Sequence, residues 1–300
     1  AEALSEMDGS TVDDAFTGFG AMLDGFEHSA LLANVRGDMV LIVLDGVSGS
    51  QTDPDILAIL DKMKANVPEI VGFEEEFAML KCFSDQAEAL ANLTADSSLA
   101  AFREQGALLD SFASSALLAN VREDLLSMAV DRIEIASDHE EINAAVEEIL
   151  DNTKACAGRA DAGESGYTYT AIFEAMGSLR DMVDGIPEVV IDRGHYGVAV
   201  FGAKLEELDG LIIVPHSAVV RISKSVTERI NEKLEALVQP YLASQELNSL
   251  YTDFMEYTGA HLNACEAYLN APEKSEKFDF SAVYIGMDAK VAGVMEKLPG

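Results

Sequence analysis

The chain contains an internal duplication. Residues 15–45 and 101–131 align without a gap at an offset of 86 residues, and 17 of the 31 aligned positions are identical. The longest identical run, Ser-Ala-Leu-Leu-Ala-Asn-Val-Arg, spans Ser29–Arg36 and Ser115–Arg122. Self-similarity at a fixed period indicates that one supersecondary unit is present more than once. We refer to residues 15–45 as copy 1 and to residues 101–131 as copy 2.

The sequence around both copies is typical of helices. Thr52-Asp53-Pro54 places a capping residue before a proline at the first helical position, and apolar residues follow from Ile56 to Met63 at three- and four-residue spacing. Ser137-Asp138 opens the matching stretch about one offset later. Runs that alternate apolar and polar residues are scarce, so we interpret the three strand candidates, 189–191, 198–201 and 211–214, as the ends of buried helices. The expected fold class is all-α.

A third, diverged copy follows. Phe201–Leu205 resembles Phe19–Leu23, and Tyr251-Thr252 resembles Tyr169-Thr170 at an offset of 82 residues. We therefore predict tandem helical repeats of about four helices each, arranged like a solenoid or as stacked bundles. The predicted divisions are residues 1–98 (first repeat with an N-terminal segment), 99–187 (second repeat) and 188–300 (diverged third repeat with a C-terminal tail).

Each predicted repeat contains helices A to D in order. We expect helix A near 15–26, 99–111 and 199–209; helix B near 29–45, 115–135 and 215–226; helix C near 53–66, 139–156 and 227–239; and helix D near 68–82, 168–185 and 246–270. Gly158–Gly166 is small and polar enough for a flexible linker, and Lys274–Lys277 is expected to form a second exposed loop.

The charge of the chain excludes several classes of partner. With 53 acidic against 20 basic residues, the net charge is −33. Such a field repels nucleic acid and anionic lipid, and it attracts divalent cations. No apolar run approaches the roughly 20 residues that span a bilayer, so we expect no membrane insertion. We expect a secreted or organelle-lumenal protein, with the cytoplasm of a salt-adapted organism as the alternative. The sequon Asn92-Leu93-Thr94 and the start Ala1-Glu2-Ala3, typical of a processed chain, are compatible with the first location.

No catalytic or metal-binding motif is found. The five histidines show no zinc-ligand spacing, and the sequence contains no nucleophile elbow, phosphate-binding loop or dinucleotide fingerprint. We therefore expect no enzyme activity, no metal site and no cofactor. The cysteines Cys82, Cys156 and Cys265 cannot all pair internally; we interpret them as buried thiols, and the sequence leaves open whether two of them form a disulfide.

The acidic segments do not contain an EF-hand. Residues 45–55 lack the carboxylate spacing and closing glutamate of an EF-hand. Loose, low-affinity calcium binding by Glu74–Glu76 or Asp138–Glu141 is the remaining expectation, although such runs are usually solvated helix faces.

Polar residues also recur in the duplication. The repeat-equivalent positions, which we expect to have a structural or interface role, are Asp24, Asn34, Arg36, Asp38, Asp110, Asn120, Arg122 and Asp124. For the two arginines we predict ion pairs with Asp24 and Asp110 of the preceding helix, or with the next repeat; a ligand anchor is the alternative. Arg36-Gly37-Asp38 spells the tripeptide that integrins recognise, but a helical placement makes this a chance match.

These observations favour a non-catalytic role. We predict an acidic helical repeat protein with a structural or scaffolding function, which associates with copies of itself or with a protein partner in a filament or matrix. The alternative is a carrier that encloses an apolar ligand, a lipid or pigment, between helices rich in methionine and phenylalanine.

Overall fold

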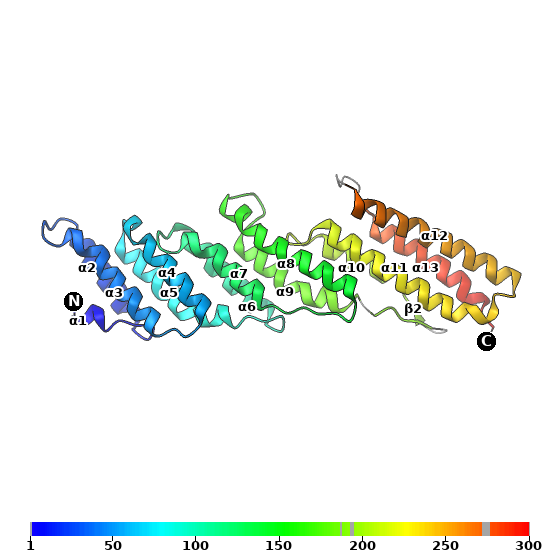
Figure 1. Cartoon of the computed structure of the whole chain (residues 1–300), viewed down its shortest axis with the longest axis horizontal. Helices are drawn as coiled ribbons and strands as arrows, with labels where there is room; N and C mark the ends of the chain where they lie inside the picture. The colour runs from blue at the N-terminus through cyan, green and yellow to red at the C-terminus, as the bar shows by residue number, and fades with distance from the viewer. Residues whose placement is uncertain (1, 187, 193–194, 272–276, 300) are drawn as a thin grey trace. The chain divides into compact units, whose positions relative to one another are not determined.

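A computed structural model describes residues 2–186, 188–192, 195–271 and 277–299 (Figure 1). Within these ranges the chain forms thirteen α-helices, short 3-10 turns and one two-stranded hairpin, which confirms the all-α class. The helices are α1 (Glu2–Ser5), α2 (Asp13–Gly25), α3 (Arg36–Gly49), α4 (Pro54–Asn66), α5 (Phe73–Ala91), α6 (Leu99–Ser111), α7 (Arg122–Arg132), α8 (Glu140–Asp161), α9 (Tyr169–Asp184), α10 (Ala199–Asp209), α11 (His216–Val238), α12 (Gln245–Asn270) and α13 (Phe280–Lys297). A repeat or solenoid arrangement, and the three sequence-based divisions, stay predictions.

The chain divides into two compact units. Unit 1 contains residues 1–134 and 154–174, and unit 2 contains residues 135–153 and 175–300, so the division falls within α8 and α9. Copies 1 and 2 both lie in unit 1 and have the same order of elements. Each has a helix, a loop with a 3-10 turn (Ala33–Val35 or Ala119–Val121), and a second helix that begins at the arginine shared by the two copies.

Several predicted boundaries in the last third are wrong. Residues 215–226 and 227–239 were expected as two helices but form the single helix α11, because residues 217–238 contain neither glycine nor proline and their apolar residues keep a helical spacing. In the order of helices, α12 is therefore the third of this region, although residues 246–270 were expected as the fourth, and α13 is the fourth. Ile191–Asp192 (β1) pairs antiparallel with His195–Tyr196 (β2) instead of ending a helix, and residues 211–214 form a turn before α11.

The predicted loops are placed as follows. Gly158 lies inside α8 rather than in the linker, and the chain turns at Gly163 and Gly166, whose φ angles of 68° and 90° are readily adopted by glycine. Most of the expected loop at 274–277 lies outside the described residues.

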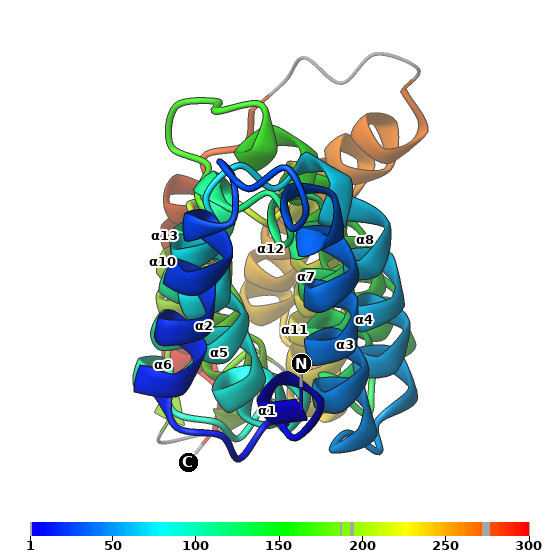
Figure 2. The ribbon, with the colours of Figure 1, turned by 90° about the vertical axis from the view of Figure 1, so that its left-hand side faces the viewer.

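In unit 1, α2 packs along α5, α3 lies beside α4, and α1 covers part of α3 (Figure 2). The α2–α5 contact is close because Gly20 lacks a side chain: a Cβ there would lie 2.5 Å from Glu74 Cα. Four residues later, the Asp24 carboxylate accepts hydrogen bonds from the backbone N–H groups of Phe73 (2.8 Å) and Glu74 (3.0 Å). Asp24 thus caps the first turn of α5 from another helix.

Copy 2 repeats this arrangement. A Cβ at Gly106 of α6 would lie 2.6 Å from Thr170 Cα, at the start of α9. Asp110 accepts hydrogen bonds from the N–H groups of Tyr169 and Thr170, both at 2.9 Å, and from the Thr170 hydroxyl at 2.7 Å. A glycine followed four residues later by a capping carboxylate therefore docks α2 on α5 and, in the same way, α6 on α9.

Unit 2 contains a related contact in a more closed bundle. A Cβ at Gly202 of α10 would lie 2.7 Å from Phe280 O at the start of α13, and Glu206 accepts a hydrogen bond from Ser281 N at 3.3 Å. Phe280-Ser281, not Tyr251-Thr252, thus occupies the place of Tyr169-Thr170. Helix α12 packs against both α11 and α13, which encloses Tyr284 completely.

Candidate interaction surface

The recurring arginines stack on aromatic rings. The guanidinium of Arg36, the first residue of α3, lies 4.8 Å from the centroid of the Phe73 ring, and that of Arg122 lies 5.0 Å from the centroid of Tyr169. Arg122 also forms an ion pair with Asp161 at 2.7 Å, whereas the buried Nε of Arg36 has no hydrogen-bond partner in the described part of the chain. These are cation–π contacts at the first turn of helix D.

The predicted ion pairs of these arginines with Asp24 and Asp110 are therefore wrong. Both aspartates cap the helix whose first residue carries the aromatic ring, because free backbone N–H groups at a helix N-terminus are strong donors for a carboxylate. The position of Arg36–Asp38 in the first turn of α3 agrees with the helical placement expected from the sequence.

Helices α4 and α5 cover the loop and first turn of copy 2. The Asn66 amide donates a hydrogen bond to the Leu117 carbonyl at 2.9 Å, and the Asn66 and Asn120 side chains are hydrogen-bonded to each other. Glu76, only 7% exposed, accepts bonds from the Ser115 hydroxyl (2.6 Å) and from the N–H groups of residues 116 (2.5 Å) and 117 (3.1 Å). Three donors to one buried carboxylate fix this loop against α5.

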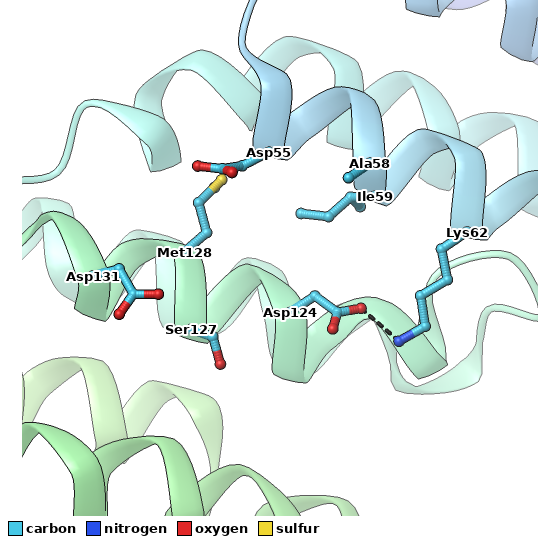
Figure 3. A pocket seen from close by; sticks show the side chains of 8 residues that line it. All are labelled: Asp55, Ala58, Ile59, Lys62, Asp124, Ser127, Met128 and Asp131. Carbon is cyan, nitrogen blue, oxygen red and sulfur yellow. Dashed lines mark hydrogen bonds and ion pairs between the residues drawn. The ribbon is translucent and has the colours of Figure 1, made fainter.

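Along α7, the contact with α4 continues as a groove (Figure 3). The Lys62 ammonium reaches the Asp124 carboxylate at 2.5 Å, and Ile59 faces the groove from α4. The groove has a volume of about 390 Å³ and is lined by Asp55, Ala58, Ile59, Lys62, Asp124, Ser127, Met128 and Asp131. Its polar lining combines three aspartates with Lys62 and Ser127.

The same surface is open in copy 1. Leu31 is 79% exposed, whereas Leu117 at the equivalent position is fully buried, and Ile42 is 39% exposed against 5% for Met128. Asn34 is exposed, as its counterpart Asn120 is, but it lacks the bond that Asn120 forms with Asn66, and Asp38 is exposed where Asp124 is partly covered. Helix α1 packs on α3, and the backbone of Met7, two residues after α1, lies against Gly46 in the C-terminal half of α3. We call Leu31, Asn34, Asp38 and Ile42 the open face.

Unit 2 uses a similar set of contacts. Asn152, one offset after Asn66, donates a hydrogen bond to the Ile213 carbonyl at 2.8 Å, in the loop before α11. Glu148, one offset after Lys62, is hydrogen-bonded to Ser217 and lies 3.7 Å from Arg221. An asparagine thus bonds a backbone carbonyl at both contacts. The charges are exchanged between the two sides, because Lys62 pairs with Asp124 in unit 1 whereas Glu148 faces Arg221 in unit 2.

The sequence-predicted polar positions therefore separate into two kinds. Asp24, Asp110, Arg36 and Arg122 fix each copy to the helix that begins at Phe73 or Tyr169, whereas Asn120 and Asp124 contact α4, the helix before copy 2. Asn34 and Asp38 have no equivalent contact among the described residues. The sequence analysis did not identify Lys62 and Asn66, which bond Asp124 and Asn120, or Glu76, which bonds the loop before them. A signal existed for Glu76, since it follows Phe73 by three residues and so lies on the apolar face of α5.

The acidic runs and the cysteines are placed as follows. Among the residues that the structure describes, no three histidine, cysteine or carboxylate side chains are grouped as metal ligands. Glu76, expected on a solvated face, is buried and bonded to copy 2. Among the described residues, Cys82, Cys156 and Cys265 form no disulfide; Cys82 is exposed, contrary to expectation, and the other two are buried.

Unit 2 holds one buried polar cluster. His261, on α12 and 6% exposed, lies 2.9 Å from the Ser223 hydroxyl and 3.5 Å from the Cys265 sulfur. Burial lowers the pKa of His261 to about 4 and raises the pKa of the Cys265 thiol to about 12. A neutral imidazole beside a protonated thiol is a packed, hydrogen-bonded pair, not an activated nucleophile.

The phenylalanines that suggested a ligand cavity include core residues. Phe16 and Phe77 are fully buried with their ring centroids 6.3 Å apart, and Phe83 packs against Phe112 at 6.5 Å. Within the described ranges, no helix has the length and apolar character that crossing a bilayer requires. The chain matches no protein-family model, and comparisons with curated proteins and with solved structures give no match.

Proposed function

We propose that the protein is a non-catalytic helical scaffold that associates through its helix faces with copies of itself or with another protein. The observation that carries this proposal is the difference between Leu117, fully buried, and Leu31, 79% exposed, in two identical runs of sequence. A leucine that is buried in one copy and exposed in the other marks the surface at which we propose this association.

Charge supports a role for ions in this association. A net charge of −33 opposes the approach of two copies, and dissolved salt or calcium screens that repulsion. A secreted or lumenal compartment remains our proposed location, with the cytoplasm of a salt-adapted organism as the alternative. The carrier function stays a prediction, because no described contact favours an apolar ligand.

Sedimentation velocity of the full chain tests the proposal. We expect the sedimentation coefficient to increase with protein concentration, and to increase further with sodium chloride or calcium chloride. Magnesium chloride at matched ionic strength shows whether calcium acts only as a screening ion. A chain that stays monomeric at every salt and protein concentration would contradict self-association.

A further inference from the structure

The open face has a defined chemical pattern. Its four residues lie at intervals of three, four and four, so they form one stripe along the loop and α3. The stripe offers an apolar contact at Leu31, an amide at Asn34 and a carboxylate at Asp38. In the part of the chain that the structure describes, Asp38 has no ion pair, whereas Asp124 is paired with Lys62.

Copy 2 shows which helix such a stripe accepts. On α4, Ile59, Lys62 and Asn66 lie at i, i+3 and i+7, on one side of the helix. Lys62 pairs with Asp124, and Asn66 bonds both the Leu117 carbonyl and the Asn120 side chain. The stripe of copy 2 therefore accepts a helix with an aliphatic residue, a lysine three residues later and an asparagine four residues after the lysine. These three side chains meet an apolar group, a carboxylate and an amide, respectively.

A second copy of the chain is a poor source of this helix. Its α4 is already bonded to its own copy 2 through Asn66, and the related asparagine of α8, Asn152, is bonded to Ile213. Two open faces placed against each other would bring their Asp38 carboxylates together in a chain that is already strongly acidic. The charge of the face calls for a cationic partner.

We propose that the open face binds one helix of a different protein, and that this helix carries the aliphatic-x-x-Lys-x-x-x-Asn pattern of α4. The inference rests on the proposed scaffold function and names its partner by chemistry. Binding places the aliphatic residue against Ile42, as Ile59 lies beside Met128 in copy 2, pairs a lysine with Asp38, and places an asparagine amide over Leu31, against its carbonyl and Asn34. Helix-in-groove recognition commonly uses anchors at these spacings.

A peptide of residues 51–70 serves as the probe, labelled with fluorescein at its N-terminus. In the peptide, Leu57→Lys supplies an amine that forms a lactam with the Asp61 carboxyl, with loss of water. This bridge holds the peptide helical on the side away from Lys62 and Asn66, and circular dichroism checks its helicity. Fluorescence anisotropy then measures its affinity for the full chain. We expect saturable binding that Leu31→Asp weakens at least tenfold, because the equivalent leucine is fully buried in copy 2.

The ion pair supplies a charge-reversal test. Asp38→Lys should weaken binding about fivefold, and a Lys62→Glu peptide should recover binding to that variant, as expected for a partly exposed pair. Glu207→Lys is the matched control, since it changes the net charge equally at an exposed position of unit 2. Equal effects of the two lysine variants, or no saturable binding of a helical peptide, would overturn the proposal.

Sedimentation separates this inference from the function on which it rests. A monomeric chain that binds the peptide through Asp38 would reject self-association and keep the inference. A wild-type oligomer that Leu31→Asp dissociates, together with no peptide binding, would instead assign the open face to a second copy and overturn the inference.

Discussion

Leu31 and Leu117 occupy the same place in two identical eight-residue runs, but the first is exposed to solvent and the second is completely buried. The local structure does not account for this difference, because both runs end in the 3-10 turn that precedes a helix beginning at arginine. What differs is the neighbour. Copy 1 packs against α4 and α5 on the side that follows it in sequence, and copy 2 is covered by the same two helices on the side that precedes it; of the described helices before copy 1 there is only the four-residue α1, on α3.

The comparison distinguishes two sets of residues. One set fixes a copy to the helix that begins at Phe73 or Tyr169. The glycine and aspartate of α2 belong to this set, and those of α6 make the same contacts. Those that face outward, such as Asn120 and Asp124, are bonded only where a further helix is present. Sequence identity thus predicts the first set of contacts, while the second depends on what packs against the copy.

The largest difference is expected at the two leucines. Leu117→Ala should lower the free energy of unfolding by about 2–5 kcal/mol, because it removes a fully buried side chain and leaves a cavity. Leu31→Ala should change it by no more than about 0.5 kcal/mol, since that side chain is largely exposed. Denaturant unfolding of the full chain measures both. Similar losses at the two positions would mean that copy 1 is covered in solution.

Glu76 provides the next test, because nothing described takes its place in front of copy 1. Glu76→Ala should destabilise the fold by about 3 kcal/mol, since the Ser115 hydroxyl and two backbone N–H groups lose a charged acceptor in a buried loop. Glu75→Ala is the control, because Glu75 is exposed and adjacent. Thermal unfolding of the two variants should differ clearly; equal midpoints would show that the three hydrogen bonds contribute little.

A contact shared by both copies should respond equally in each. Gly20→Ala and Gly106→Ala should each cost about 1–3 kcal/mol, because the added Cβ would lie 2.5–2.6 Å from the backbone of the facing helix. Gly18→Ala, where a Cβ meets nothing within 4 Å, should stabilise α2 by up to about 1 kcal/mol. Chemical denaturation provides the comparison, and a destabilising effect in only one copy would contradict a common docking contact.

The smallest effect is expected at the exposed ion pair. Asp124→Asn should lower stability by about 0.2–1 kcal/mol at low salt, because it removes a partly exposed partner of Lys62, and the loss should shrink as salt is added. Asp38→Asn should show no such salt-dependent loss, since the described chain offers Asp38 no cation. Urea titrations of both variants at low and high salt measure the difference, and an equal salt dependence would argue against it.

The helical class and the two clear copies were predictable because their periodicity and caps are local features. Asp53 is an example, since its side chain accepts from the N–H groups of Asp55 and Ile56 as its place before Pro54 indicated. The last third was harder. Nothing local distinguishes the match of Tyr251-Thr252 to Tyr169-Thr170 from the contact formed by Phe280-Ser281, which depends on Gly202 and Glu206 far away in sequence.

The interaction surface was only partly predictable. The recurring Asn34, Asp38, Asn120 and Asp124 could be found from the duplication, but which of them have a bonding partner could not, because identical residues lie in different surroundings. The prediction for Asp24 was wrong because it considered the arginine that is near in sequence. The carboxylate instead binds backbone N–H groups of a helix that begins 49 residues later, which the sequence does not place beside it.

Hydrogen exchange measured by mass spectrometry tests the central claim most directly. Residues 29–36 and 115–122 have the same sequence, so their intrinsic exchange rates are closely matched and a difference in protection reports their surroundings. We predict at least tenfold slower exchange in residues 115–122, where Glu76 accepts bonds from the amides of Ala116 and Leu117. Equal protection of the two runs, or slower exchange in residues 29–36, would contradict a covered copy 2 and an open copy 1.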